Sequence, residues 1–230
     1  MYDELKAEVF QANVDLSRHG LVTLTWGNVS GIDRQACCMA IKPSGVDYES
    51  MMPEDMVVVD MEGNIVDGRL RPSSDTPTHL QLYKAFPAIG GIVHAHSIHA
   101  TMFAQACREI PCFGTTHADH FNGPIPVTRF LTEDEVRRGY ERETGSIIVE
   151  RFAGLDPVDT PGVLVAGHAP FAWGKNAADA VKNSLILERI AEMALGALQL
   201  NPALQPIPSF IQGKHYQRKH GPKAYYGQKK

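Results

Sequence analysis

The sequence predicts one α/β domain in which helices flank a mixed or largely antiparallel sheet. Segments with helical and strand-like patterns alternate along the 230 residues. Several neighbouring strand-like segments are joined too closely for the crossover helix that parallel strands require. No Gly/Ser run, low-complexity tract or charge block divides the chain, so we expect a single domain over residues 1–230.

The first half of the chain predicts a helix, a group of short strands and a second helix. Apolar residues at helical spacing predict a helix over 3–18, which Gly20 ends. Thr76 before Pro77 has the pattern of an N-cap and a first helical residue, and it predicts a helix over about 77–86. Residues that favour β structure predict four strands, at 22–26, 38–42, 56–60 and 64–66.

The second half predicts buried strands that alternate with helices. GGIVHAH and GVLVAGH are apolar runs and predict strands at 90–96 and 162–168. Thr132 followed by Glu135 is a capping-box pattern and predicts a charged helix over about 132–151. The remaining expected elements are a helix over about 97–107, a loop over 111–126, a helix over 176–199, a short C-terminal helix and an aromatic, basic tail over about 213–230.

Composition and charge restrict the class of protein. A net charge of -4 does not predict a nucleic-acid-binding surface over the chain as a whole. We expect no membrane segment, because no stretch approaches the roughly 18 apolar residues that span a bilayer. The acidic, amphipathic start is unlike a signal peptide, and neither GxGxxG nor GxxxxGK[ST] occurs. The four cysteines contain no CxxC pair, which is typical of a reducing compartment, so we expect the cytoplasm.

Three histidines form the sharpest chemical pattern. Alternate side chains of a strand share a face, so His94 and His96 should project the same way. His168 ends a second apolar strand in a similar manner. Two imidazoles from one strand and one from another predict a three-nitrogen site for Zn²⁺ or a similar divalent metal. His117 and His120 are competing candidates, and spacing alone does not choose among them.

Other residues near this pattern have two interpretations. Structural hydrogen bonding is the alternative for any strand-end histidine, and we assign that role to His19, His79 and His99. A carboxylate commonly completes a metal site, and Asp75 lies just before a predicted helix, where an anion is stabilised. Helix capping explains the position of Asp75 equally well.

Three short segments have the composition of a phosphate site. Each follows a predicted strand or precedes a predicted helix: Trp26-Gly27-Asn28-Val29-Ser30, Lys42-Pro43-Ser44-Gly45 and Ser73-Ser74. They offer hydroxyls, an amide, a lysine and small residues that expose backbone N–H groups, and such groups bind phosphate. Similar dipeptides also occur in ordinary turns, so each segment alone indicates little.

The C-terminal stretch KHYQRKHGPKAYYGQKK is basic and aromatic and contains no acid. A solvated end and contact with nucleic acid are two interpretations of its charge. Its tyrosines are also competent proton donors or acceptors, so closure over an anionic substrate is a third.

Seven motifs together resemble a known family. From about residue 3 to 228, the sequence is similar to the L-ribulose-5-phosphate 4-epimerases of the class II aldolase family. The resemblance implies a three-layer α-β-α fold with a central, largely antiparallel sheet. It also implies a homotetramer with active sites between subunits. The motifs, in order, are TWGNVS, KPSGVDY, RPSSDTPTH, GGIVHAHS, GTTHADHF, GHAPFAWGKNA and KHYQRKHGPKAYYGQ.

The resemblance further implies a metal site and an acid/base pair. Zinc usually occupies the metal site, one ion per subunit, and Mn²⁺ or Co²⁺ also suits such ligands. The acid/base pair is Asp119 and Tyr226, with Tyr226 reaching the site of a neighbouring subunit. His120 departs from the family, in which tyrosine is common at that position. The implied metal ligands are Asp75, His94, His96 and His168.

Further residues are assigned to the substrate by the same resemblance. Those around the substrate phosphate are Gly27, Asn28, Lys42, Ser44, Gly45, Ser73 and Ser74. Secondary candidates at the same interface are Thr115, Glu141, His215 and Arg218.

The implied activity is that of an isomerase, which interconverts L-ribulose 5-phosphate and D-xylulose 5-phosphate. The hydrogen at C4 is not next to the carbonyl at C2, so the family breaks and remakes the C3–C4 bond by retro-aldol and aldol steps, with a metal as Lewis acid. One alternative is a class II aldolase for fuculose or rhamnulose 1-phosphate. Those enzymes, however, typically have a glutamate at the position that Asp75 occupies in this chain. Another is a non-enzymatic assembly module like the adducin head domain. The sequence does not show whether the pathway is that of arabinose, ascorbate or another pentose or hexonate. It also does not identify the native metal, the consequence of His120 or the order of the tail.

Overall fold

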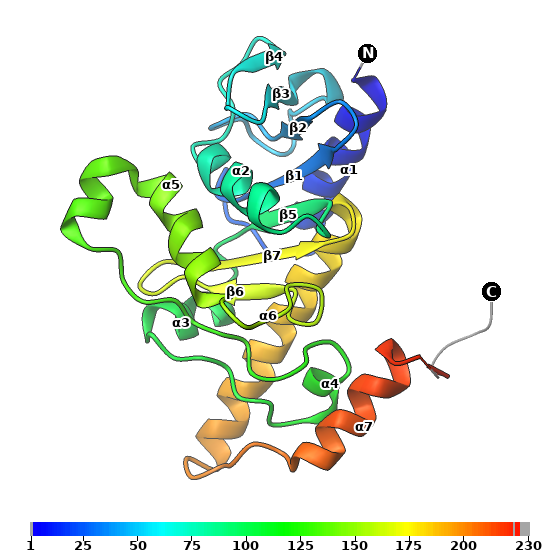
Figure 1. The fold of residues 1–230 in the computed structure, drawn as a ribbon, viewed down its shortest axis with the longest axis vertical. Helices are drawn as coiled ribbons and strands as arrows, with labels where there is room; N and C mark the ends of the chain where they lie inside the picture. Colours follow the sequence, from blue (N-terminus) through cyan, green and yellow to red (C-terminus); the bar gives the residue numbers. More distant parts are fainter. Residues whose placement is uncertain (1, 223, 226–230) are drawn as a thin grey trace.

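The computed structural model describes residues 2–222, 224 and 225, and it places helices on both faces of one sheet (Figure 1). The strands β3 and β4 lie at one end of the molecule, and α4 and α7 lie together at the other. The elements in chain order are α1 (Asp3–Arg18), β1 (Asn28–Asp33), β2 (Cys38–Ile41), the 3-10 helix η1 (Pro53–Asp55), β3 (Val57–Asp60), β4 (Ile65–Asp67), α2 (Thr76–Ala85), β5 (Gly91–His94), α3 (Ile98–Gln105), α4 (Thr115–Ala118), α5 (Glu133–Arg151), β6 (Gly162–Leu164), β7 (Pro170–Gly174), α6 (Ala177–Leu200) and α7 (Ser209–His220).

The strands of the described residues form one sheet in the order β4-β3-β2-β1-β5-β7-β6. Every neighbouring pair is antiparallel, which confirms the predicted sheet. The register of the central strands positions the site. Asn28 on β1 lies opposite His94 on β5, and His94 lies opposite Phe171 on β7.

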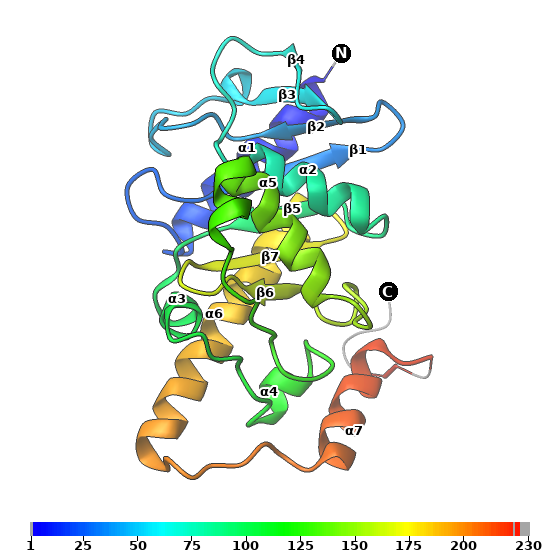
Figure 2. The same cartoon turned by 60° about the vertical axis from the view of Figure 1, so that its left-hand side comes forward.

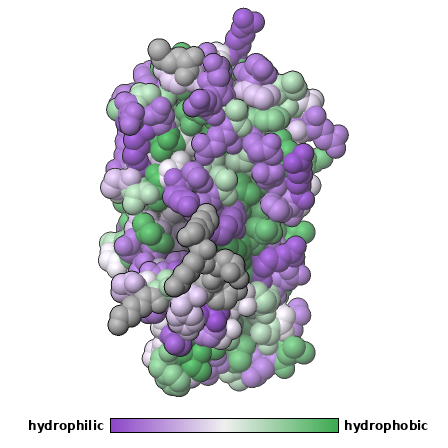
Figure 3. Space-filling view, turned by 90° about the vertical axis from the view of Figure 1, so that its right-hand side faces the viewer, coloured by the Kyte–Doolittle hydropathy of each residue, from purple (hydrophilic) through white to green (hydrophobic). Residues whose placement is uncertain are grey.

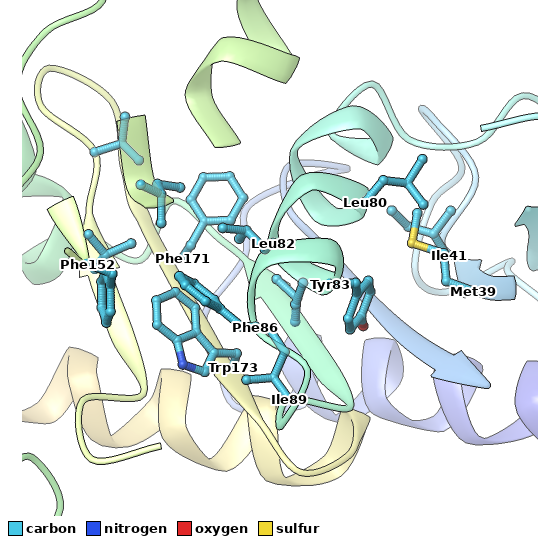
Figure 4. Close-up of a cluster of buried hydrophobic side chains, with 14 of the residues drawn as sticks. Met39, Ile41, Leu80, Leu82, Tyr83, Phe86, Ile89, Phe152, Phe171 and Trp173 are labelled. Carbon is cyan, nitrogen blue, oxygen red and sulfur yellow. The ribbon is translucent and has the colours of Figure 1, made fainter. Parts of the chain in front are cut away.

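Alternate residues of the central strands bury apolar side chains on both faces of the sheet. On β2, Met39 and Ile41 face a core shared with α2 and α5. Cys38 and Ala40 face the opposite core, which α1 and α6 complete. Figure 2 shows α2 and α5 in front of the sheet and α1 and α6 behind it, so the predicted three-layer fold is confirmed. Aromatic rings meet at the centre of the first core (Figure 4): Phe86, Phe152 and Trp173.

The predicted strand over 22–26 is wrong. These residues form a loop in which Leu24 has a φ of 53° and Gly27 a φ of 90°, and these left-handed conformations turn the chain. The strand instead begins at Asn28, and three of its six residues, Asn28, Gly31 and Asp33, are of types that are depleted in strands. It forms because β2 and β5 pair with it on both sides, and this pairing outweighs its weak β propensity.

Both strands that carry the predicted metal ligands are shorter than expected. β5 ends at His94 and β6 ends at Leu164, so His96 and His168 lie in the segments that follow. The sequence also did not predict β7, which pairs with both β5 and β6. Of the three histidines, only His94 lies on a strand, so the shared strand face from which the site was predicted does not include His96.

The long helices agree better with the sequence. α1, α5 and α6 begin and end within about two residues of their predicted bounds, as expected for helix ends. The capping box of Thr132 and Glu135 is present at the start of α5. Asp75, not Thr76, is the N-cap residue of α2, because Thr76 already has helical geometry. The predicted loop over 111–126 contains the short helix α4.

A third apolar core lies between α3, α6 and β6, and α4 packs on α7 beside it. Figure 3 shows one face of the molecule, where hydrophilic residues cover most of the surface and hydrophobic residues gather at the lower end. Leu200 and Phe210 are exposed at the two ends of the segment that joins α6 to α7. In the part of the chain that the structure describes, no helix has the length and apolar character needed to cross a membrane.

Candidate metal centre and adjoining cavity

Three imidazole rings converge where β5 leaves the sheet. One nitrogen from each of His94, His96 and His168 lies within 4.8 Å of the other two. The Nε2 atoms of His94 and His96 are 3.2 Å apart, and the His168 ring centroid lies 4.8 Å from that of His94 and 5.0 Å from that of His96. His94 is buried, while the other two rings are partly exposed. Such an arrangement of nitrogen donors suits one divalent metal ion.

The ring of His94 is held by β7. Its Nδ1 lies 3.0 Å from the backbone carbonyl of Pro170, to which it donates when it carries the proton. Its face stacks on Phe171 with 4.2 Å between the ring centroids. These contacts leave Nε2 directed at the other two rings. A hydrogen bond from the far nitrogen to a carbonyl is the usual support of a metal-binding histidine.

The protonation of the site also fits a metal. Burial, together with the neighbouring imidazoles of His94 and His96, lowers the pKa of His168 to about 4. Burial likewise lowers the pKa of His96. Both rings are therefore neutral at physiological pH and have the lone pair that coordination needs.

Asp75 does not cap its helix. It is the N-cap residue of α2, but its side chain makes no capping hydrogen bond and instead accepts one from Asn28 Nδ2 at 2.7 Å. Burial alone raises the pKa of this carboxyl, but nearby His94 and His79 and the Asn28 hydrogen bond outweigh burial and hold the pKa below its ordinary value. The capping interpretation of the Asp75 side chain is wrong. Its ionised carboxylate lines the same cavity as the three histidines, but it is not part of the group whose donor atoms lie within 4.8 Å of one another.

One cavity of about 530 Å³ brings the predicted metal and phosphate residues together. It lies between the loop before β1, the turn after β2, the start of α2 and the three-histidine cluster. Its lining residues are Thr25, Trp26, Gly27, Asn28, Lys42, Pro43, Ser44, Gly45, Ser73, Ser74, Asp75, His94, His96, Tyr140, Glu141 and His168.

Backbone hydrogen bonds join the two loops that carry the serines. Ser44 N donates to the carbonyl of Arg71 at 3.0 Å, and Ser73 N donates to the carbonyl of Lys42 at 3.0 Å. Asn28 Nδ2 also donates to Ser73 Oγ at 3.0 Å, which connects β1 to the same loops. Within the described residues, Asn28 Oδ1 is buried without a partner. A buried acceptor without a partner is costly, and a donor on a bound molecule would satisfy it.

Gly27 permits the close approach of the loop before β1 to β5. Its φ is 90°, and a Cβ atom there would lie 2.8 Å from the carbonyl oxygen of His94. A residue with a side chain would therefore push the loop away from the histidine cluster.

Lys42 is the only lysine or arginine among the described residues that line the cavity. Its side chain is fully buried, Nζ donates to the carbonyl of Val46 at 2.6 Å, and the ammonium lies 4.7 Å from the centre of the Tyr48 ring. Burial lowers the pKa of Lys42 to about 8, while the charge of Asp47 opposes the shift. The lysine is thus mostly protonated at neutral pH and can pair with an anion.

Asp119, the implied acid/base residue, does not line this cavity. Its carboxylate follows α4 and faces α7, where Oδ2 accepts from Arg218 Nη2 at 2.6 Å and Oδ1 lies 3.1 Å from His215 Nδ1. Burial raises the pKa of Asp119, but Arg218 and His215 outweigh it and hold the pKa below its ordinary value. Thr115 begins the same short helix. Tyr226 lies outside the described residues.

The other histidines lie elsewhere. His117 Nε2 contacts the carbonyl of Gly123 at 2.8 Å, and His120 Nε2 lies 3.4 Å from Lys219 Nζ. Neither belongs to the three-histidine group. His79 is buried with Nδ1 2.7 Å from Ser30 Oγ, the structural role that the sequence predicted for it.

The sequence assigned no role to Tyr140 or to Thr25, the first residue of the TWGNVS motif, yet both line the cavity. Tyr140 and its neighbour Glu141, a secondary candidate, come from α5 at a point where Gly139 interrupts the helix with a φ of 146°. A glycine inside a helical pattern is the one local signal for this wall, because isolated glycines in helices often have a packing or functional reason.

Comparison with known proteins shows extensive similarity. Residues 7–195 match the family described as class II aldolase and adducin N-terminal domain. L-ribulose-5-phosphate 4-epimerase UlaF of Salmonella paratyphi B is 58% identical over 226 residues, which cover 98% of this chain and 99% of the relative. The protein of the same name from Salmonella typhi is equally similar, with 58% identity and the same coverage of both chains.

Solved structures share the fold. A chain named L-fuculose 1-phosphate aldolase superposes with a TM-score of 0.82 at 26% identity, over 94% of this chain and 95% of the other. An l-fuculose-1-phosphate aldolase from Thermus thermophilus superposes with a TM-score of 0.68 at 23% identity, over 88% of this chain and 100% of the other. The second similarity, at its lower identity, indicates the fold alone.

Proposed function

The chain belongs to the class II aldolase and adducin family, and from this premise we propose that it interconverts L-ribulose 5-phosphate and D-xylulose 5-phosphate by epimerisation at C4. Relatives that are 58% identical over nearly the whole chain have the name of this activity. The observation that carries the proposal is the single cavity in which three convergent histidines adjoin an amide, serines and a buried lysine. A ketose phosphate needs a metal site for its carbonyl oxygen and a phosphate site in the same cavity.

The family is metal-dependent, and the neutral imidazoles fit a divalent ion. We propose zinc, one ion per subunit, because three nitrogen donors and a carboxylate are typical zinc ligands, although Mn²⁺ and Co²⁺ accept the same donors. When bound, the metal supplies Lewis acidity to the ketose carbonyl oxygen. The residues that would hold it are Asp75, His94, His96 and His168.

The loops of the cavity are proposed to bind the phosphate. Asn28, Ser73 and Ser74 offer an amide and hydroxyls, and the turn of Ser44 and Gly45 offers backbone N–H groups. Lys42 adds a positive charge. A firm hold on the phosphate is needed because the aldehyde fragment must turn over between bond cleavage and bond formation without leaving the site.

Inversion at C4 requires proton transfer on both faces of the turning aldehyde. One group removes the C4 hydroxyl proton as the C3–C4 bond breaks, and the other returns a proton after the aldehyde has turned. We assign these roles to Asp119 and Tyr226. Asp119 is absent from the cavity wall of its own chain. We therefore propose that it acts, like Tyr226, at the cavity of a neighbouring copy in a homotetramer.

The proposed assembly and location have further support. The exposed Leu200 ends α6, the exposed Phe210 lies in the first turn of α7, which packs on α4, and hydrophobic exposure of this kind suits contact between copies. We propose a cytoplasmic enzyme, because all four cysteines are free thiols.

An aldolase that cleaves fuculose or rhamnulose 1-phosphate is the second candidate, since a structure of that name shares the fold with a TM-score of 0.82. The shorter Asp75, which hydrogen-bonds Asn28, favours the epimerase because a metal-bound aspartate reaches less far toward a substrate than a glutamate. A non-enzymatic assembly module is disfavoured, because it would have no use for convergent metal and phosphate groups.

Incubation of the zinc-loaded protein with L-ribulose 5-phosphate tests the proposal. We expect conversion to D-xylulose 5-phosphate that stops when zinc is removed with a chelator and returns when zinc is restored. Asp119→Asn should lower turnover by a factor of about 10² to 10⁴, the range of general acid–base catalysis, while zinc content stays at the wild-type level. Failure of folded, zinc-replete protein, with cleavage of L-fuculose 1-phosphate instead, would favour the aldolase.

Mixed tetramers test the shared site. We expect His94→Ala and Asp119→Asn proteins to be nearly inactive alone, but to regain activity after they are unfolded and reassembled together. Some cavities in the mixture then combine intact histidines with an intact Asp119 of a neighbour. Mixing that restores no activity, while wild-type protein treated in the same way recovers, would place Asp119 at the cavity of its own chain or outside catalysis.

A further inference from the structure

Tyr140 is the only tyrosine on the cavity wall among the described residues, and its hydroxyl lies beside His168, one of the proposed metal ligands. The hydroxyl oxygen is 3.4 Å from Nδ1 of His168, and the ring centroids are 6.2 Å apart. We propose that Tyr140 is a positioning residue for the metal centre, which accepts a hydrogen bond from Nδ1–H of His168 and so directs Nε2 of that ring toward His94 and His96. The inference rests on the metal site proposed above.

The position of His168 makes such support necessary. His94 is the last residue of a paired strand, and its ring is held by a carbonyl and by a stacked phenylalanine. His168 instead lies outside the strands, in a turn after Gly167, which has a φ of 71°. Among the described residues, Tyr140 makes the only hydrogen bond to its ring. Without that contact, rotation of the ring about its side-chain bonds would place either nitrogen toward the centre.

The backbone around Tyr140 is built to present this side chain. Gly139 has a φ of 146°, which interrupts α5 immediately before the tyrosine. On the other side, Thr144 Oγ1 donates to the Tyr140 carbonyl at 2.8 Å, and Thr78 Oγ1 of α2 donates to the Glu141 carbonyl at 2.5 Å. The segment is thus attached to α2, the helix that begins next to Asp75. One local framework therefore supports two sides of the proposed metal site.

The expected effect follows from the chemistry of metal-bound histidine. A hydrogen bond to the far nitrogen fixes the tautomer and orientation of the ring and raises its basicity, and its loss typically costs about 10- to 100-fold in metal affinity. The distance of 3.4 Å is long for such a bond. We therefore expect Tyr140→Phe to weaken zinc binding by about tenfold, at the lower end of that range.

Competition with a chromophoric chelator, in the absence of any sugar, measures this effect. Wild type and Tyr140→Phe are compared with Tyr216→Phe, which loses a hydroxyl that donates to Asp159 at 2.6 Å and does not line the cavity. We expect the zinc dissociation constant to rise for Tyr140→Phe and to stay within about twofold of wild type for Tyr216→Phe, whose hydroxyl is no support of a metal-binding histidine. Circular dichroism confirms that both variants are folded.

Nitrogen-15 spectra of zinc-loaded protein provide a readout that a purely structural role would not change. In the wild type, we expect His168 to hold its proton on Nδ1 and to exchange it slowly with water. In Tyr140→Phe, that exchange should become faster. A proton on Nε2 of His168 in the wild type would overturn the inference without any variant.

The outcomes separate this inference from the proposals on which it rests. Equal zinc affinity and equal Nδ1–H exchange in wild type and Tyr140→Phe would overturn the positioning role and leave the metal site intact. Absence of zinc binding by the wild type would overturn both. Because no sugar is present, weaker binding by Tyr140→Phe alone supports the inference whichever sugar phosphate the protein uses.

Discussion

Raising the pH through 8 should weaken capture of the substrate, because Lys42 loses its charge there. Burial lowers the pKa of this lysine to about 8. A phosphate monoester has its second pKa near 6, so it remains a dianion throughout the range in which the lysine titrates. Bound phosphate favours the charged ammonium, so this contribution to affinity is complete well below pH 8 and is lost as the pH rises above 8.

The size of the effect follows from the same pKa. With a pKa of about 8, Lys42 is roughly nine-tenths protonated at pH 7 and roughly one-tenth protonated at pH 9. Because kcat/KM reports the free enzyme, we expect it to fall about tenfold between those two values. The fall should appear mainly in KM, since phosphate bound in the complex keeps the lysine charged.

Initial rates of the zinc-loaded enzyme between pH 6.5 and 9.5 measure this dependence. Lys42→Met removes a charge-assisted hydrogen bond worth about 1.5–3 kcal/mol, so kcat/KM at pH 7 should fall roughly 10- to 150-fold. The decline near pH 8 should then be absent. Lys175→Met, which removes an exposed lysine that does not line the cavity, should leave the profile unchanged. A decline near pH 8 that persists in Lys42→Met would refute the assignment.

Two further predictions concern the scaffold of the site, and urea unfolding measures both. Gly27→Ala should lower the free energy of unfolding by about 1–3 kcal/mol, because alanine would have to adopt a left-handed φ and its Cβ would lie 2.8 Å from the His94 carbonyl oxygen. Gly196→Ala, in open space within α6, should instead raise the free energy of unfolding by about 0.5–1 kcal/mol. An equal response to the two substitutions would contradict the close approach of the loop to β5. Glu188→Gln should cost about 1–3 kcal/mol, because this buried carboxylate accepts hydrogen bonds from the first backbone amides of α3 and lies 2.8 Å from His99 Nδ1. A wild-type unfolding midpoint would rule out that role.

The helices were predictable because their signals are local. The apolar spacing of α1 and the capping box of Thr132 and Glu135 lie within a few residues of sequence, and the structure places both helices as expected. The strand over 22–26 failed because β propensity reports burial and pairing, which a short apolar segment does not contain by itself. β1 illustrates the converse, since its Asn, Ser, Gly and Asp residues become a central strand only through pairing with β2 and β5.

By itself, the sequence determined the chemical groups of the site and the family in which they occur. His94 and His96 are neighbours in any extended segment, and the serines and Lys42 are recognisable from their motifs. Only the tertiary structure decided that these groups share a wall. Antiparallel pairing sets Asn28 opposite His94, a turn after β6 brings in His168, and the break in α5 at Gly139 brings in Tyr140. No local pattern of residues contains these contacts, because each joins segments that are distant in sequence and is fixed by the packing of the whole sheet and its helices.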